Sequence, residues 1–370
     1  MAQESEAMKR NFDFVMRYGY FSAALEIISE CEKINPQDPE LPKLVAMLKE
    51  KIQLSNAAAQ EAVDQRFFEL MEFIVGHSED EIFELILASF NSADMKFQKS
   101  LIHYCKELQS LDLWGQLDPE NDVYDDFRRR AKMLKNHSDD LLWLHNRLAD
   151  ARSKNVLFAV LSNWLYMDCT TKNMYKERVY PEYFDPTIFP RTKDEVFVDV
   201  GAAAGDSALN FISAYLVQYK RIYCYEITPE SFQVMQRLLS KHDVDLRQKA
   251  AWSSPGTMRL SIRPGSSTNQ VGEHGEIEIE TVRIDDDITE PITFLKMDIE
   301  GAEMEALKGC RRQISENRPK LAICTYHGYN DIYAVPRLID EIAPGYEFYM
   351  RYHGGMYAMA TEFTLLGVPK

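Results

Sequence analysis

Three carboxylates stand at the ends of short apolar runs, and their positions point to one binding site. Asp199 closes the run VFVDV with a single valine after it, Glu226 follows RIYCY, and Asp298 follows ITFLKM. In an open parallel sheet, ligands bind outside the carboxyl ends of the strands, so these acids are expected to face one ligand. A carboxylate there suits a positive charge, or two neighbouring hydroxyls that both donate to it.

The turn after the first acid narrows the choice of ligand. Gly201 and Gly205 let backbone approach a ligand closely, and Asp206 or Ser207 can cap the helix that follows. A phosphate-binding turn has no anion beside it, whereas this turn is flanked by Asp199 and Asp206. S-adenosylmethionine, which carries a sulfonium, an ammonium and a ribose, suits this set of residues. The alternative is a plain connection between a strand and a helix.

The elements that position these residues begin near residue 191. Short apolar runs alternate with helical patterns there, which predicts an α/β fold with a parallel sheet covered on both faces. The final runs, YEFYMRYH and MYAMATEFTLLGV, are joined by GG with no helix between them, so they predict an antiparallel hairpin.

Several strings resemble the FkbM family of S-adenosylmethionine-dependent methyltransferases over about residues 145–370: VFVDVGAAAGDSA, ERVYPEYF, FLKMDIEGAEMEALKGC and the ending YHGYNDIYAVPRLIDEIAPGYEFYMRYH. The string DIEGAE after an apolar strand is the most distinctive of them. The resemblance implies a seven-strand Rossmann-like sheet with an antiparallel last strand, and O-methylation, commonly of sugar or carbocycle hydroxyls. It carries over onto Asp199, Gly201, Gly205, Glu226, Lys296, Asp298, Glu300, Gly301 and Glu303.

The turn departs from the methyltransferase pattern at one position. Ala203 stands where methyltransferases usually carry glycine, asparagine or another turn-tolerant residue. An alanine at positive φ costs about 1 kcal/mol or more, so the sequence predicts a differently shaped turn.

Methyl transfer to a hydroxyl needs a base, and three residues are candidates: Asp298, Glu300 and His327. We expect Glu300 to begin the helix after the strand, where the helix N-terminus stabilises its charge. His327 follows another strand-like run and is the favoured base, which requires a neutral imidazole. Asp298 is then expected to orient cofactor and acceptor.

No metal is predicted at this site. Asp298, Glu300 and Glu303 are oxygen ligands of the kind that Mg²⁺ accepts. Their spacing does not place them on one face of a helix, and on that ground the sequence predicts a site without metal.

The chain before the sheet is helical in pattern and divides into two parts. Residues 1–120 are predicted to form a helical domain, either a bundle or a degenerate tetratricopeptide-like unit, because Gly19, Ala24, Cys31 and Pro36 match one such repeat. Residues 121–190 form a helical bridge to the methyltransferase domain at 191–370. The N-terminal helices are a candidate surface for a protein partner or for self-association.

Bulk composition excludes several classes of function. A net charge of −16 over 370 residues argues against binding to nucleic acid or to an anionic membrane. The N-terminal residues lack the apolar core of a signal peptide, and no run of about 18 apolar residues is present. Six scattered cysteines indicate reduced thiols rather than disulfides or zinc. We therefore expect a cytoplasmic protein.

The leading hypothesis is an O-methyltransferase that acts on a sugar or glycan precursor. A nicotinamide-dependent oxidoreductase shares the strand, turn and helix, but it needs G-x-G-x-x-G, which Gly201 and Gly205 do not supply. A non-catalytic scaffold with a degenerate methyltransferase domain is the third hypothesis. Retention of Asp199, Glu226 and Asp298 together argues against it. Titration with S-adenosylmethionine and with NAD separates the three.

Overall fold

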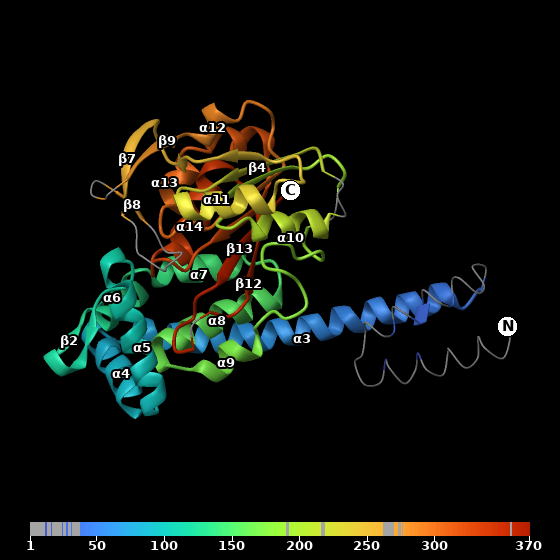
Figure 1. Ribbon diagram of the computed structural model, residues 1–370. Coiled ribbons are helices and arrows are strands. Elements are labelled where there is room, and N and C mark those ends of the chain that lie inside the picture. Colours follow the sequence, from blue (N-terminus) through green and yellow to red (C-terminus); the bar gives the residue numbers. More distant parts are fainter. Residues whose placement is uncertain are drawn as a thin grey trace. The chain divides into compact units, whose positions relative to one another are not determined.

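The computed structural model describes residues 38–189, 192–215, 219–261, 270–272, 275, 277–355 and 357–370, with isolated positions before residue 38 (Figure 1). The chain divides into two compact units, Met1–Arg66 and Phe67–Lys370, and the division lies within helix α3 (Leu41–Gly76). The sequence analysis expected a boundary near residue 120. The structure divides the chain earlier, because one hydrophobic core includes Phe67 and continues to Leu366.

Within the first unit, the described residues form a small apolar cluster: Phe12, Ala24, Ile28, Leu44 and Leu48. The positions proposed for a tetratricopeptide repeat are only partly described. Ala24 and Cys31 are buried and helical, whereas Gly19 and Pro36 lie outside the described residues.

The second unit begins with helices that lead to the sheet. They are α4 (Glu79–Ser92), α5 (Met95–Leu108), η1 (Gln109–Leu111), η2 (Pro119–Asn121), α6 (Asp125–Asn136), α7 (Ser138–Arg147), α8 (Ala151–Tyr166) and α9 (Cys169–Met174), with β1 (Leu117–Asp118) paired to β2 (Val123–Tyr124). Ser78 and Glu81 form a capping box that starts α4, so two backbone N–H groups at that helix end are satisfied.

The principal sheet has seven strands in the order β12-β13-β11-β10-β3-β4-β5. Its parallel strands are β3 (Val196–Val200), β4 (Arg221–Tyr225), β5 (Asp245–Arg247), β10 (Phe294–Met297) and β11 (Lys320–Cys324). The hairpin of β12 (Tyr346–Tyr352) and β13 (Phe363–Pro369) is antiparallel, and β13 also pairs antiparallel with β11. The predicted α/β sheet with its antiparallel hairpin is therefore confirmed, although the link between the two strands is longer than GG.

The helices that follow the parallel strands are α10 (Asp206–Ala214), α11 (Pro229–Leu238), α12 (Ile284–Asp287), α13 (Glu303–Lys308), η3 (Gln313–Asn317) and α14 (Asp331–Ile342). Phe211 of α10 stacks on Phe197 of β3 with ring centroids 4.2 Å apart, and Phe184 and Phe294 pack edge-on against Phe197. Full burial of each such ring stabilises the fold by about 1.5–3 kcal/mol.

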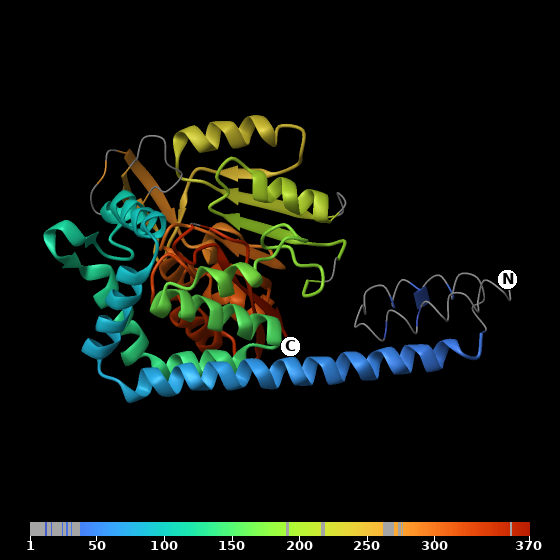
Figure 2. The ribbon, with the colours of Figure 1, turned by 90° about the horizontal axis from the view of Figure 1, so that it is seen from below.

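The helical region and the sheet are joined at the hairpin. Helices α4 to α9 gather beside β12 and β13, on the side away from β4 (Figures 1 and 2). Ala149 N–H donates to the Phe348 carbonyl (2.8 Å), and Trp114 Nε1 donates to the Tyr326 carbonyl (3.1 Å) just after β11. The backbone of β12 and the backbone just after β11 are thus held by loop residues outside the predicted methyltransferase domain.

A second sheet, β6-β9-β7-β8, stands beside the first and was not predicted. Its strands are β6 (Ala250–Ala251), β7 (Gly256–Ser261), β8 (Gln270–Gly272) and β9 (Ile277–Val282). Trp252 N–H donates to the Val282 carbonyl (2.8 Å), which extends the pairing of β6 with β9. This sheet fixes the backbone that follows β5.

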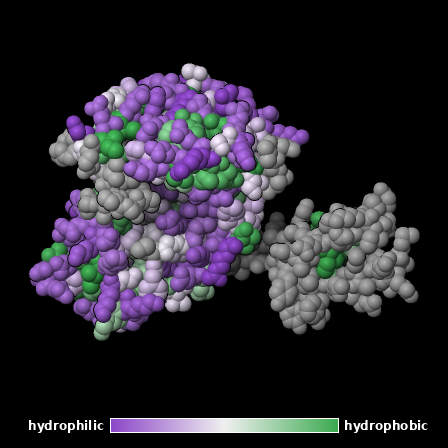
Figure 3. Space-filling model, in the orientation of Figure 1, coloured by the Kyte–Doolittle hydropathy of each residue, from purple (hydrophilic) through white to green (hydrophobic). Residues whose placement is uncertain are grey.

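Hydrophilic residues cover most of the face seen in Figure 3, and apolar residues form small patches on it. In the described part of the chain, none of the helices combines the length and the apolar character needed to cross a membrane.

Candidate active site

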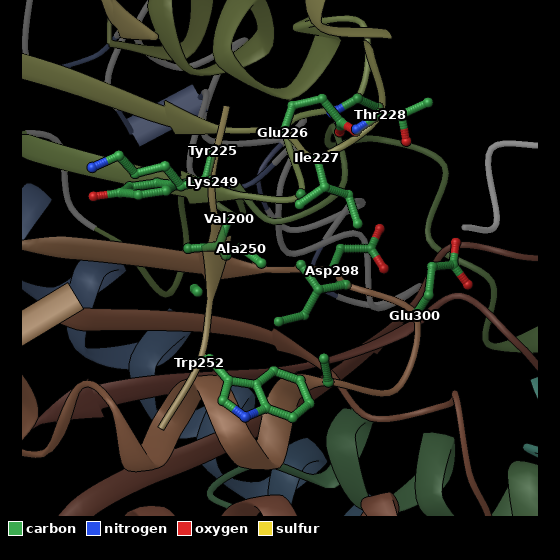
Figure 4. Close-up of a pocket in the computed structure, with 15 residues that line it drawn as sticks. Val200, Tyr225, Glu226, Ile227, Thr228, Lys249, Ala250, Trp252, Asp298 and Glu300 are labelled. Carbon is green, nitrogen blue, oxygen red and sulfur yellow. The ribbon is translucent and has the colours of Figure 1, made fainter. Parts of the chain in front are cut away.

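A cleft of about 790 Å³, including its open mouth, lies at the carboxyl ends of β3, β4 and β10. Glu226 and Trp252 lie on opposite sides of the cleft, with Asp298 and Glu300 on one flank (Figure 4). The lining residues are Val200, Gly201, Ala203, Tyr225, Glu226, Ile227, Thr228, Lys249, Ala250, Ala251, Trp252, Asp298, Ile299, Glu300 and Ala302.

The glycine turn forms one wall because only glycine fits at its start. Gly201 has φ 82°, and a Cβ added there would lie 1.9 Å from the Asp298 carbonyl oxygen. Ala203 has φ 45°, so the prediction of a different turn shape is wrong: the alanine accepts the left-handed conformation. Its N–H donates to Glu226 Oε2 (2.8 Å), which compensates part of the strain.

Asp199 lies beneath this turn, fully buried, and does not line the cleft. Lys296 Nζ lies 3.1 Å from Asp199 Oδ1 and donates to the Gly201 carbonyl (2.8 Å), while Ser207 Oγ donates to Asp199 Oδ2 (2.5 Å). Burial opposes the charge on Lys296, yet Asp199 and Asp298 raise the pKa of Lys296 above its ordinary value. The buried pair therefore fixes the turn from below.

The predicted side-chain cap of the helix after the turn is wrong. The N-cap of α10 is Gly205 at φ 91°, and no side chain caps the helix. Asp206 is exposed in the first helical turn, and Ser207 turns inward to Asp199. Of the residues proposed in this stretch, Gly201 and Ala203 line the cleft, and Asp206 and Gly205 do not.

Glu226 stands at the end of β4, as predicted, and its carboxylate borders the cleft. Oε2 accepts from Ala203 N–H and Oε1 accepts from Thr228 N–H (2.6 Å). Burial raises the pKa of Glu226, and the hydrogen bonds from these N–H groups lower it. Burial has the larger effect, so the pKa lies above the ordinary value. The Thr228 side chain also hydrogen-bonds this carboxylate, which has about four acceptor positions in all, so acceptor capacity remains for ligand hydroxyls.

The wall opposite Glu226 was missed in the sequence analysis. Trp252 and Lys249 follow β5, and Lys249 Nζ is held by Glu280 (3.1 Å) and Asp287 (3.2 Å). β5 consists of Asp-Leu-Arg, so no apolar run marked it as a strand. The alternation of strands with helices was the one signal that pointed to a further strand end there.

Asp298 follows β10, and its side chain is 24% exposed. Tyr183 Oη donates to Oδ2 (2.8 Å) and Tyr326 Oη donates to Oδ1 (3.2 Å). Burial opposes its charge, but Lys296 and then His327 lower the pKa of Asp298 below its ordinary value. Asp298 is therefore ionised at neutral pH.

Glu300 does not begin a helix, contrary to the prediction. It has φ 55° and lies in the turn before α13, which starts at Glu303. Glu303 holds this turn, because its carboxylate accepts from Ile299 N–H (2.8 Å) and Gly301 N–H (3.1 Å). Burial raises the pKa of Glu300 to about 7.

His327 lies behind Asp298 and Glu300 and does not line the cleft. Its side chain is 1% exposed, with Nε2 3.5 Å from both Asp298 Oδ1 and Glu300 Oε2, and Nδ1 3.0 Å from Glu303 Oε1. Burial disfavours its charge, but the carboxylates, Glu303 first, raise the pKa of His327 to about 10. This imidazole is protonated at pH 7, whereas the role of base requires a neutral one.

Further carboxylates surround this end of the cleft. Burial, with neighbouring acids, raises the pKa of Glu182 to about 8 and that of Glu362 to about 7. Tyr326 Oη donates to Glu362 Oε2 (3.2 Å), so one tyrosine joins Glu362 to Asp298. Burial lowers the pKa of His353 to about 4.

The cleft thus has a part that can accept two hydroxyls at Glu226 and a part rich in acid around Asp298. Such an arrangement can hold a ribose at one end and a positive charge beside an ionised carboxylate at the other. At the Glu226 end, the backbone N–H groups of Ala203 and Thr228 already donate to Glu226, so these two are not available to a pyrophosphate.

Comparisons with known proteins agree with this geometry. Residues 199–351 match the model of the methyltransferase FkbM domain. The methyltransferase FkbM from Methylobacillus flagellatus KT has a TM-score of 0.57 and 24% identity, over 74% of this chain and 71% of that chain. It shares the fold.

Two further solved structures are more distant. An rRNA methylase from Streptococcus thermophilus has a TM-score of 0.33 and 12% identity, over 49% of this chain and 90% of that chain. Fibrillarin from Aeropyrum pernix, with natively bound S-adenosyl-L-methionine, has a TM-score of 0.31 and 11% identity, over 48% of this chain and 67% of that chain. No curated protein matches the chain at a significant level.

The family match decides between the classes of enzyme considered above. FkbM proteins are S-adenosylmethionine-dependent methyltransferases, so the predicted cofactor is confirmed and the nicotinamide oxidoreductase is set aside. The matched residues begin at Asp199 and include Glu226, Asp298 and His327. The chain therefore carries a methyltransferase FkbM domain and is an S-adenosylmethionine-dependent methyltransferase.

Proposed function

We propose that the protein transfers the methyl group of S-adenosylmethionine to a hydroxyl of a sugar or glycan precursor. The observation that carries the proposal is the position of two ionisable carboxylates in one cleft: Glu226 at the end of β4 and Asp298 at the end of β10. A carboxylate suits each of two parts of the cofactor, the ribose hydroxyls and the positive sulfonium.

In this proposal the ribose hydroxyls donate to Glu226, and Ile227 and Trp252 enclose the adenine. The sulfonium lies toward Asp298, whose lowered pKa keeps it ionised beside a positive charge. The backbone at Gly201 lies against the cofactor, since no Cβ stands between them.

The reaction is an in-line displacement at the methyl carbon. A lone pair of the acceptor oxygen forms the new O–C bond while the C–S bond breaks, and its electron pair stays on sulfur as a neutral thioether. The hydroxyl proton passes to a carboxylate of the cleft, and general-base help of this kind contributes about 10²–10⁴ in rate. We assign Glu300 as the carboxylate that takes this proton, because Glu300 lines the cleft and His327 does not.

The acidic end favours a hydroxylated acceptor. Asp298, Glu300, Glu182 and Glu362 present acceptor oxygens at or near one end of the cleft, and carboxylates accept hydrogen bonds from several hydroxyls of one molecule. A sugar carries several neighbouring hydroxyls that can donate to these carboxylates at the same time.

The proposal is tested by cofactor binding and by acceptor choice. Glu226→Ala should weaken S-adenosylmethionine binding by about 1.5–3 kcal/mol, the scale of a hydrogen bond to a charged group, in calorimetric titration. Exposed Glu230→Gln on the next helix is the matched control and should leave affinity unchanged. A labelled methyl group should move from the cofactor to members of a panel of free and nucleotide-linked sugars. Unchanged affinity for Glu226→Ala, or transfer to amines alone, would refute the assignment.

A further inference from the structure

The cluster behind the cleft has the composition of a cation site. In the described residues, Asp298, Glu303 and His327 form the one group of three or more histidine, cysteine or acidic side chains whose ligand atoms lie within 4.8 Å of one another. Glu300 belongs beside them, 3.5 Å from His327 Nε2. Residues 298–303 do not form one helix, as the prediction of a metal-free site assumed: only Glu303 is helical, and His327 follows β11.

His327 is aimed into this cluster, where its contacts are ion pairs with three carboxylates. It is 1% exposed, and neither ring nitrogen meets hydrogen-bond geometry with any neighbour. The carboxylates of Asp298, Glu300 and Glu303 now pair with a protonated ring. A metal ligand must be deprotonated, so a cation bound at Nε2 would displace the ring proton and take over its contacts with the acids.

The two ring nitrogens face different groups. Nδ1 lies 3.0 Å from Glu303 Oε1, and Glu303 is itself fixed by the N–H groups of Ile299 and Gly301. A metal-binding histidine commonly directs its second nitrogen to a carboxylate that sets its orientation. Glu303 stands in that place, which leaves Nε2 directed toward Asp298 and Glu300.

We propose that His327 Nε2, Asp298 Oδ1 and Glu300 Oε2 bind a divalent cation of the Mg²⁺ or Mn²⁺ kind. Nε2 lies 3.5 Å from each of the two oxygens. Adjacent ligands of an octahedral ion with bonds of about 2.1–2.4 Å lie about 3.0–3.4 Å apart, which the two distances from Nε2 approach. Glu300 is not in the group whose ligand atoms all lie within 4.8 Å of one another, so its carboxylate must move toward Asp298 to complete the set. Two carboxylates and one imidazole match the donors that these ions accept.

The position of the site gives the cation a role in the proposed function, on which this inference rests. Asp298 and Glu300 border the cleft, whereas His327 and Glu303 lie behind them. The open positions of the ion therefore face the acceptor. An acceptor hydroxyl bound there becomes more acidic, its proton passes to the second oxygen of Glu300, and its oxygen attacks the methyl carbon as the C–S bond breaks.

The test uses the full chain stripped of metal with EDTA and titrated with Mn²⁺ alone, followed by electron paramagnetic resonance. We expect one saturable site from which Mg²⁺ displaces Mn²⁺. Glu300→Gln and His327→Gln should each weaken Mn²⁺ binding by about 10-fold or more, as the loss of one ligand does. Glu305→Gln, an acid of the same segment that pairs with Lys308, is the matched control and should bind Mn²⁺ as the unaltered protein does.

S-adenosylmethionine titration of the same samples separates the two proposals. Saturable Mn²⁺ binding that is lost in Glu300→Gln, with cofactor affinity retained, supports the cation site. If the protein binds the cofactor but shows no saturable Mn²⁺ binding, the cation site is contradicted and the proposed function is not. The same holds if Glu300→Gln binds Mn²⁺ as tightly as the unaltered protein. If the unaltered protein does not bind S-adenosylmethionine, or if Glu226→Ala binds it equally well, the proposed function is contradicted.

Discussion

The two ends of the cleft, on either side of Asp298, differ in whether their buried carboxylates are paired with donors and cations of the protein. At the glycine turn, Asp199 is matched by Lys296 and Ser207, and Glu226 accepts two backbone N–H groups. Beyond Asp298, the carboxylates outnumber their donors, and the pKa values of Glu300 and Glu362 rise to about 7.

The difference separates a site that is already electrostatically complete from one that is not. Charges that are paired and hydrogen-bonded within the fold need no ligand to be stable. Carboxylates crowded together in a low dielectric hold protons or attract a cation. The turn end is therefore preorganised for the cofactor, and the acidic end is built to receive positive charge together with the acceptor.

We expect the largest loss of cofactor binding and of stability from a substitution at Gly201, where the turn contacts the end of β10. In Gly201→Ala the new Cβ would lie 1.9 Å from the Asp298 carbonyl oxygen, at φ 82°, so the turn and the end of β10 must both shift. We expect loss of cofactor binding and a decrease of roughly 2–4 kcal/mol in the free energy of unfolding, from the clash and the backbone strain together.

Calorimetry and urea unfolding measure these two quantities. Gly256→Ala is the control, because the nearest atom to its Cβ would be 3.5 Å away and its φ is not positive. A Gly201→Ala protein that binds S-adenosylmethionine normally would show that the turn does not contact the cofactor.

A smaller effect is expected from pH at the turn end. The raised pKa of Glu226 means that it takes up a proton at a higher pH than an ordinary glutamate. A protonated carboxyl is a poorer acceptor for ribose hydroxyls, so cofactor affinity should be full at neutral pH and fall as the pH is lowered through that pKa.

Calorimetric titration across acidic pH measures this effect, and Glu226→Gln should remove the pH dependence while lowering the affinity at neutral pH. Equal pH dependence in the two proteins would assign the titration to another group and weaken the contrast between the two ends.

The smallest effect concerns the strained alanine of the turn. Ala203→Gly relieves a left-handed conformation at φ 45°, which should raise the free energy of unfolding by up to about 1 kcal/mol after the greater entropy of the unfolded chain is counted. Thermal unfolding measures the change, with Ala202→Gly as a control that should destabilise the protein. A lower melting temperature for Ala203→Gly would mean that Glu226 holds the turn without strain.

Local pattern was enough to predict the sheet and the acids at its strand ends. Apolar runs such as VFVDV identify buried parallel strands without reference to the rest of the chain, and the end of each run places Asp199, Glu226 and Asp298. The short polar strand β5 carries no such signal, so Lys249 and Trp252 on the far wall were missed.

The charge state of the site depends on contacts that no local pattern contains. His327 meets Glu303 across 24 residues of sequence and is buried by the surrounding fold, so its pKa of about 10 follows from three-dimensional convergence. Glu300 was placed in a helix because acids are common there, whereas the carboxylate of Glu303 holds the preceding residues in a tight turn. Trp114 reaches the Tyr326 carbonyl from a segment assigned to a different domain.

The position of β13 between β11 and β12 has a consequence for synthesis of the chain. The ribosome completes β11 at Cys324, about forty residues before β13 begins at Phe363. During that interval the backbone groups on the β13 side of β11 have no partner strand. At about 5–20 residues per second, that interval lasts a few seconds, during which the apolar edge at Leu321 and Ile323 can pair with other chains. Nascent chains of this enzyme should therefore recruit chaperones late in translation, and ribosome stalling before residue 363 should yield aggregates rather than a cofactor-binding fragment.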